Sequence, residues 1–306
     1  MIKTLSRYPK IIVVLGPTAS GKSKLAIKLA KKFGGEIISA DSRQVYKGMD
    51  IGTAKPTKKD TIAIPHHLID IKNPGQNYTA AEYKRDAIKV IKKVIDKKRL
   101  PILTGGTGLY IKVIIDNLDI PEVRPNFNLR KKLEKEIEEY GLKYVFRKLI
   151  KLDPEAAYIV DPNNSRRVIR ALEIALETKK PFSAQRKAGR PLFKFLEIGI
   201  KIPKIELEAR IGQRVDEMIK NGLVEEVKKL IKKYDENQRS FDAIGYREII
   251  EYLNKNLSFD QTIDLIKKNT GQYAKRQMTW FKKDKKIHWI KNQKEAGRLV
   301  RKFLEK

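Results

Sequence analysis

IIVVLGPTASGKS, residues 11–23, decides the fold of this chain. Its apolar first part predicts a buried parallel strand, and the apolar residues of 24–33 recur at helical spacing and predict a helix directly after it. Between the two lies a full match to G-x-x-x-x-G-K-[ST], the loop whose backbone N–H groups cradle phosphate oxygens. A preceding strand and a following helix are the context that this motif requires. The sequence therefore predicts a phosphate-binding site.

The side chains of this loop have predicted tasks of their own. Lys22 would place a cation on the terminal phosphate, Ser23 would ligate Mg²⁺, and the N-terminus of the helix would add its dipole. Loops of this type commonly bind nucleotides such as ATP. The candidate phosphate contacts are Gly16, Pro17, Thr18, Ala19, Ser20, Gly21, Lys22 and Ser23.

The rest of the chain alternates strands and helices around one interruption. Strand-like runs at 34–41, 66–71, 100–106, 195–202 and 285–290 are accompanied by helical patterns. This rhythm predicts an α/β fold, a doubly wound parallel sheet with its site at the carboxyl ends of the strands. Near Asn117 the rhythm breaks and a highly charged helical stretch begins. We expect a P-loop core of residues 1–118 and 191–306 and an inserted helical domain of residues 119–190.

Charge is the strongest signal in the composition. Lys+Arg number 67 against 37 Asp+Glu, a formal net charge of +30. Such self-repulsion is typical of proteins whose partner is a polyanion, and nucleic acid is the favoured partner. The alternative is a lysine-rich, well-solvated surface without a special partner.

Other features of the composition restrict location and chemistry. With no cysteine the chain has no disulfide and no thiolate nucleophile, and its three histidines give little scope for a metal cluster. No apolar run is long enough to span a bilayer, and the first ten residues lack the apolar segment of a secretion signal. We expect a cytoplasmic protein without membrane association.

Two polar residues follow predicted strands and are candidates for catalysis. Asp41 lies where the strand 34–41 ends, facing the phosphate loop, and could act as a general base or simply cap a turn. Thr107 lies on the glycine-rich loop after the strand 100–106, where its hydroxyl could bond a substrate or stabilise the turn. Asp116, an acidic residue considered as a magnesium ligand, falls at the end of a helical pattern and is given no catalytic role.

Basic residues gather in two helical segments. Residues 275–283, KRQMTWFKK, place Lys275 and Arg276 near Trp280 and Phe281; we expect the cations to contact phosphates and the aromatic rings to lie in the core. Residues 165–173, SRRVIRALE, carry three arginines at a helix start, which suit either a nucleic-acid edge or a solvated face.

The chain resembles the bacterial tRNA dimethylallyltransferases, also called tRNA isopentenyltransferases. The segments that carry the resemblance extend from the first strand almost to the C-terminus, and the longest of them is highly specific. They are GPTASGKS, ISADSRQVYKGMDIGTAKP, PHHLID, TGGTGLY, RVIRALE, RVDEMIKNGLVEEV, AIGYRE and AKRQMTWF. The resemblance implies transfer of a dimethylallyl group from dimethylallyl diphosphate to N6 of the adenosine 3′-adjacent to the anticodon, with release of diphosphate.

The same resemblance implies roles for individual residues. Asp41 would take the proton of the amine, Lys22 would meet the leaving diphosphate with Mg²⁺ as cofactor, and Thr107 would contact substrate. The inserted domain would grip the anticodon stem-loop, and we expect a monomer. Arg210 and Arg214 are candidates for a further diphosphate clamp. Implied tRNA contacts, besides Asp41, Thr107, Lys275 and Arg276, are Ser42, Arg43, Gln44, Arg166, Arg167, Val168, Ile169 and Arg170.

One departure from the family pattern and three alternative functions stay open at this point. Gly271 stands where the family usually carries arginine. A P-loop kinase for small molecules would need a triphosphate. A prenyltransferase for free adenine nucleotides would need neither the insertion nor the charge. A non-catalytic RNA-binding module would not be expected to keep Lys22, Ser23 and Asp41 intact.

Overall fold

The computed structural model describes residues 8–121, 123, 125–185 and 187–305. The chain forms two compact units: a core unit from Met1–Ile115 and Leu192–Lys306, and an insertion unit, Asp116–Pro191. The insertion unit is slightly longer than the expected span of 119–190. The segment on which the expected lack of a secretion signal rests lies mostly outside the described residues. None of the helices in the described part of the chain is long and apolar enough to cross a membrane.

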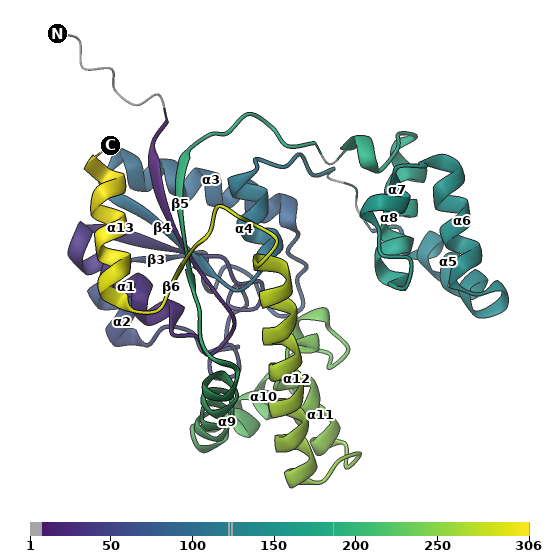
Figure 1. Ribbon diagram of the computed structural model, residues 1–306. Helices are drawn as coiled ribbons and strands as arrows, with labels where there is room; N and C mark the ends of the chain where they lie inside the picture. The colour runs from purple at the N-terminus through teal and green to yellow at the C-terminus, as the bar shows by residue number, and fades with distance from the viewer. Residues whose placement is uncertain (1–7, 122, 124, 186, 306) are drawn as a thin grey trace. The chain divides into compact units, whose positions relative to one another are not determined.

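The core unit is built on one sheet of six parallel strands (Figure 1). β1 lies at its centre between β4 and β5, in the order β3-β2-β4-β1-β5-β6. Strands covered on both faces need near-continuous apolar sequence, which is why these runs could be recognised. The predicted fold class is confirmed. The strands are β1 (Lys10–Leu15), β2 (Gly35–Ser39), β3 (His66–His67), β4 (Leu100–Gly105), β5 (Lys194–Ile200) and β6 (His288–Ile290).

The third predicted strand is much shorter than expected. Of residues 66–71 only the first two pair, because Leu68 and Asp70 adopt positive φ angles of 62° and 56° that end an extended chain. Lys55 holds the resulting turn. Its Nζ donates to Asp70 Oδ1 at 2.5 Å and to Asp50 Oδ1 at 2.6 Å.

Helices cover both faces of the sheet (Figure 1). α1 (Lys22–Phe33) and α13 (Gln293–Glu305) pack on one face, where Val14, Leu29 and Val300 belong to one buried cluster. On the other face lie α3 (Ala80–Asp96) and α4 (Gly108–Ile115), and the short α2 (Lys58–Ala63) precedes β3. Because α4 ends at Ile115, Asp116 follows a helix end, as the sequence predicted.

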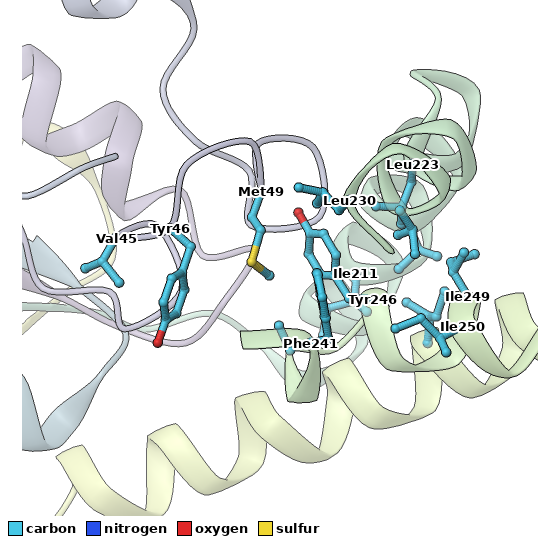
Figure 2. Close-up of a cluster of buried hydrophobic side chains, with 14 of the residues drawn as sticks. Val45, Tyr46, Met49, Ile211, Leu223, Leu230, Phe241, Tyr246, Ile249 and Ile250 are labelled. Carbon is cyan, nitrogen blue, oxygen red and sulfur yellow. The ribbon is translucent and has the colours of Figure 1, made fainter. Parts of the chain in front are cut away.

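A group of helices after β5 completes the core unit. It consists of α9 (Lys204–Lys220), α10 (Leu223–Ile231), the 3-10 turn η2 (Arg239–Asp242), α11 (Tyr246–Leu253) and α12 (Phe259–Phe281). Its core also takes Val45, Tyr46 and Met49 from the segment after β2, as Figure 2 shows. The Glu226 carboxylate on α10 holds that segment by accepting the backbone N–H of Asp50 at 3.0 Å. The same carboxylate accepts the hydroxyl of Tyr246 on α11 at 2.5 Å. The chain after β2 is therefore tied to helices encoded far downstream.

The insertion unit is helical, with its own core. Leu133, Val145 and Leu149 are buried together with residues of α8. A fully buried carboxylate, Glu173, accepts two hydrogen bonds from Arg130 at 2.7 and 2.8 Å. The helices are α5 (Phe127–Tyr140), α6 (Leu142–Leu152), α7 (Ala156–Ile159) and α8 (Ser165–Thr178), followed by the 3-10 turn η1 (Ser183–Gln185).

Candidate active site

The phosphate loop lies between β1 and α1, beside a cavity of about 870 Å³. Ala19 and Gly21 adopt positive φ angles of 59° and 85°, which fold the chain tightly before the helix begins at Lys22. Among the described residues the buried hydroxyl of Ser20 has no hydrogen-bond partner. A buried polar atom without a partner is costly unless a ligand satisfies it.

Lys22 sits in a strongly perturbed environment. Burial, followed by the nearby Arg214 charge, lowers the pKa of its ammonium group to about 8, against an opposing contribution from Asp41. Its Nζ donates to Pro17 O at 3.2 Å. A buried cation beside a second cation binds an anion readily because the anion repays part of the desolvation cost. The electrostatics thus favour a phosphate or diphosphate here.

Both candidate clamp arginines of α9 line the same cavity. Arg210 donates from Nη2 to Glu206 Oε1 at 2.6 Å, and its Nη1 lies 3.9 Å from the position that a Cβ on Gly21 would take. Burial lowers the pKa of Arg214, and Asp41 opposes that shift. The structure thus brings both arginines to the loop: Arg210 against its backbone, and Arg214 into the field of Lys22 and Asp41.

Asp41 follows β2 and organises a turn of residues 41–44. Its Oδ1 accepts the backbone N–H of Arg43 at 2.9 Å and that of Gln44 at 3.4 Å. Within the described residues its second oxygen, Oδ2, makes no hydrogen bond. The capping role that the sequence left open is therefore present, and it uses one oxygen of the carboxylate. The other remains available to accept a proton.

The next two side chains of this turn are engaged within the chain. Gln44 donates from Nε2 to Thr53 O at 3.2 Å, and its Oε1 accepts the Ser39 hydroxyl at 3.0 Å. Arg43 donates from Nη1 to Arg239 O at 2.7 Å. These bonds fix the turn; contact of Arg43 and Gln44 with tRNA stays a prediction.

Thr107 lies directly beside the Asp41 turn. Its Oγ1 accepts the backbone N–H of Ser42 at 3.0 Å and donates to Ser42 Oγ at 3.3 Å. The strand ends approach closely here, since a Cβ on Gly105 would come within 2.1 Å of Ala40 O. The structure thus unites Asp41, Ser42 and Thr107, which were predicted from two separate loops.

The Asp41 charge acts on two buried tyrosines, Tyr83 and Tyr110, and on the partly buried Tyr273, none of which sequence reasoning assigned to the site. The rings of Tyr83 and Tyr110 stack with centroids 3.9 Å apart, and the Asp41 charge contributes to raising the pKa of both. Burial raises the pKa of Tyr273 to about 12, which hydrogen bonds with Thr107 and Gln277 moderate. The signal for Tyr110 was its position within TGGTGLY; Tyr273 had no local signal.

The predictions for the basic C-terminal end of α12 are confirmed only in part. Lys275 and Arg276 are exposed, and the Arg276 guanidinium lies 5.9 Å from the centre of the Tyr273 ring. The core assignment is confirmed for Phe281, which is 3% exposed, and is wrong for Trp280, which is 38% exposed. The ring of Trp280 instead covers Gly108, where a Cβ would come within 2.4 Å of it.

The arginine-rich start of α8 divides into exposed and buried residues. Arg166 and Arg167 are exposed, as nucleic-acid contacts would need to be. Val168 and Ile169 have their side chains in the core of the insertion unit, and a contact of these two residues with tRNA stays a prediction. Arg170 donates to Glu173 Oε2 at 2.5 Å and to Val123 O at 2.9 Å, which makes it chiefly a structural residue.

No group of three or more His, Cys, Asp or Glu side chains within the described residues is arranged to hold a metal ion. Mg²⁺ bound to a phosphate needs few protein ligands, because it keeps several waters and takes the remaining oxygens from the substrate. A loop with one hydroxyl at Ser23 and an orphaned hydroxyl at Ser20 fits such an ion.

Comparisons with known proteins agree with this geometry. A family model described as IPP transferase matches residues 44–284. The tRNA dimethylallyltransferase of Acetivibrio thermocellus is 46% identical over 284 residues, 92% of this chain and 91% of that protein. The one of Halothermothrix orenii is 45% identical over 303 residues, 95% of this chain and 92% of that protein.

Solved structures give the same result. The full-length tRNA isopentenylpyrophosphate transferase of Bacillus halodurans is 38% identical with a TM-score of 0.72, covering 98% of this chain and 96% of that one. A eukaryotic dimethylallyltransferase, solved acting on tRNA, is 29% identical with a TM-score of 0.73, covering 92% of this chain and 74% of that one.

Proposed function

The chain belongs to the tRNA dimethylallyltransferase (IPP transferase) family, and we propose that it transfers a dimethylallyl group from dimethylallyl diphosphate to N6 of the adenosine 3′-adjacent to the anticodon, releasing diphosphate. The observation that carries this proposal is geometric: Lys22 and Arg214 line one cavity with the phosphate loop, and hydrogen bonds of Gln277 and Thr107 link that loop to the Asp41 turn. Cations for a leaving diphosphate and a carboxylate for an acceptor amine thus share one neighbourhood.

The donor half of the reaction belongs to the phosphate loop. The C1–O bond of an allylic diphosphate breaks when the departing diphosphate is neutralised, and preorganised cations supply that stabilisation as the charge develops. Lys22, the loop amides, Arg210 and Arg214 would bind the diphosphate oxygens. Mg²⁺ at Ser23 would add further positive charge to the leaving group.

The acceptor half belongs to the Asp41 turn. The exocyclic amine of adenine is a poor nucleophile because its lone pair is delocalised into the ring. As N6 bonds to C1 of the allyl group, the amine must lose a proton, and Asp41 Oδ2 is the proposed acceptor. Thr107 and the backbone around Ser42 would orient the base, which must leave its stack to enter the site.

Recognition of tRNA is assigned to exposed cations. Arg166 and Arg167 on the insertion unit and Lys275 and Arg276 on α12 would contact the phosphate backbone of the anticodon stem-loop, which proteins recognise largely by shape and phosphates. The net charge of +30 supports a polyanionic partner. A monomer in the cytoplasm is the proposed working form.

One experiment separates this function from the alternatives. Purified protein is incubated with radiolabelled dimethylallyl diphosphate and Mg²⁺, and with unmodified tRNA, AMP or no acceptor. We expect label in tRNA only, on the adenosine next to the anticodon. Label in AMP would instead establish a nucleotide prenyltransferase. In a parallel reaction that contains ATP in place of dimethylallyl diphosphate, ATP consumption without tRNA would support a kinase. Binding of tRNA with no transfer would support a non-catalytic module.

A further inference from the structure

Gln277 on α12 joins the two glycine-rich loops of the candidate site. Its Oε1 accepts the backbone N–H of Thr18 at 2.8 Å, and its Nε2 donates to Gly106 O at 2.8 Å. Thr18 belongs to the phosphate loop and Gly106 to the loop that carries Thr107. The side chain is 5% exposed. One amide therefore bridges segments that are far apart in the sequence.

The chemistry of the bridge fits an amide and no charged group. A backbone N–H can only donate and a backbone carbonyl can only accept, so these two partners fix which end of the amide is oxygen. A carboxylate would satisfy Thr18 and leave the carbonyl of Gly106 facing a second acceptor. The bond to Gly106 is buried and the bond from Thr18 is partly buried, so leaving either partner unpaired is costly.

Close packing keeps the amide in place from the opposite side. A Cβ on Gly106 would lie 2.1 Å from Gln277 Nε2 and 3.7 Å from Lys22 Nζ. Glycine at position 106 therefore permits the approach of the amide. Lys22, Gly106 and Gln277 meet at one point, where the loop for the donor touches the loop for the acceptor.

The hydrogen bonds continue from this point to the general base. Thr107, the residue after Gly106, accepts the N–H of Ser42, whose neighbour is Asp41. The path from Thr18 through Gln277 and Thr107 to Ser42 connects the group that would hold the diphosphate with the group that would take the proton. Transfer requires C1 of the donor and N6 of the acceptor at reacting distance. A change of about 1 Å in such a distance costs on the order of 10²-fold in rate.

We propose that Gln277 is a positioning residue for the transfer step: its amide fixes the spacing between the phosphate loop and the Asp41–Thr107 turn. This assignment rests on the proposed function. If it holds, the rate of transfer between the two bound substrates depends on Gln277. The affinity for each substrate does not, because each substrate keeps its own contacts.

The test uses variants on both sides of the bridge. Gln277→Met keeps the size of the side chain and removes both bridging hydrogen bonds together with the bond to Tyr273. Gly106→Ala displaces the amide from the other side. Gln272→Met, an exposed glutamine on the same helix, is the matched control. Each full-length protein is examined by thermal melting, by equilibrium binding of inorganic diphosphate and of tRNA, and by single-turnover transfer with both substrates saturating.

We expect Gln277→Met and Gly106→Ala to bind diphosphate and tRNA like the wild-type protein and to transfer about 10²-fold more slowly, the cost of a small misplacement. The control should match the wild type throughout. A folded variant that transfers at the wild-type rate overturns the proposal, as does a rate loss matched by an equal loss of diphosphate affinity, which would mean support of one loop only. If one variant does not fold, the other decides. A wild-type protein that transfers nothing to tRNA overturns the proposed function as well.

Discussion

The core unit and the insertion unit place their candidate functional residues in opposite ways. In the core unit the candidates for the transfer step, Asp41, Thr107 and Gln277, are buried or half-buried, and hydrogen bonds there join distant segments: Ser42 to Thr107, Gln277 to Thr18. In the insertion unit the candidates are exposed arginines, Arg166 and Arg167, on the surface of a helix whose other side forms the core. Bond-making chemistry needs fixed geometry, whereas attraction to a phosphate backbone needs charge and little else.

This difference predicts two kinds of defect. Substitutions of the core-unit residues that serve the transfer step should lower the rate of transfer and leave tRNA affinity intact. Substitutions on the insertion unit should lower tRNA affinity and leave the rate at saturation intact. The following experiments test the division, from the largest expected effect to the smallest.

Asp41→Asn should have the largest effect. Asparagine keeps an oxygen that can accept the N–H groups of Arg43 and Gln44, so the turn should persist, but it cannot accept a proton. Single-turnover transfer should fall by about 10²- to 10⁴-fold, the usual contribution of a general base. Thermal melting and tRNA binding should match the wild type. Transfer at the wild-type rate would remove Asp41 from the mechanism and leave it as a cap.

Lys22 should determine both the rate of transfer and its dependence on pH. Lys22→Ala should lower turnover by about 10²-fold or more, because a preorganised charge that meets the leaving group is removed. In the wild type the ammonium group loses its proton as pH rises through about 8, so kcat/KM should fall above that pH. Bound diphosphate favours the charged form, so the fall in kcat should begin at higher pH.

Lys22→Arg is the matched variant for the pH effect. Arginine stays charged at every accessible pH, so the alkaline fall of kcat/KM should disappear even where the rate at neutral pH is reduced. The measurement is kcat/KM for dimethylallyl diphosphate over a range from about pH 6 to about pH 10, which ends near the ordinary pKa of lysine. An unchanged alkaline fall in this variant would assign it to another group.

The exposed Arg166 and Arg167 should contribute to the salt dependence of tRNA binding. Affinity for tRNA should fall steeply with salt, and Arg166→Ala with Arg167→Ala should reduce the slope of log K against log salt by about 1 for each phosphate that is no longer neutralised. Filter binding over a series of KCl concentrations measures this slope. Transfer at saturating tRNA should be unchanged. A flat salt response of the wild type would contradict a polyanion as the reason for the positive charge.

Gly271 should give the smallest effect, and it concerns stability alone. It lies within α12, and a Cβ added there would meet nothing within 4 Å. Gly271→Ala should raise the free energy of unfolding by up to about 1 kcal/mol, the usual helix preference of alanine over glycine. Urea denaturation measures the change, with transfer activity unaffected. A loss of stability would show that the helix needs glycine at this position.

Sequence reasoning recovered what local patterns encode. The phosphate loop and the strands beside it were found because a short motif and continuous apolar runs specify them. Gln277 and Tyr273 were not assigned to the site, since their partners lie far away in the sequence. Val168 and Ile169 belong to a matching motif, yet their side chains are buried. A family motif can contain residues that contact the substrate and residues that pack in the core. The sequence alone does not distinguish the two kinds, whereas the burial of their side chains in the structure does.

The order of the strands has a consequence for how the protein folds as it is synthesised. β1 lies at the centre of the sheet and is synthesised before the other five strands, but its partner β5 is encoded after the whole insertion unit. Pairings so distant in the chain form slowly, because a long loop must close before they are made. The helices of the insertion unit have mostly local contacts and can form first. Until β5 arrives, one edge of an apolar strand stays unpaired, and this is the stage at which the growing chain is most prone to aggregation.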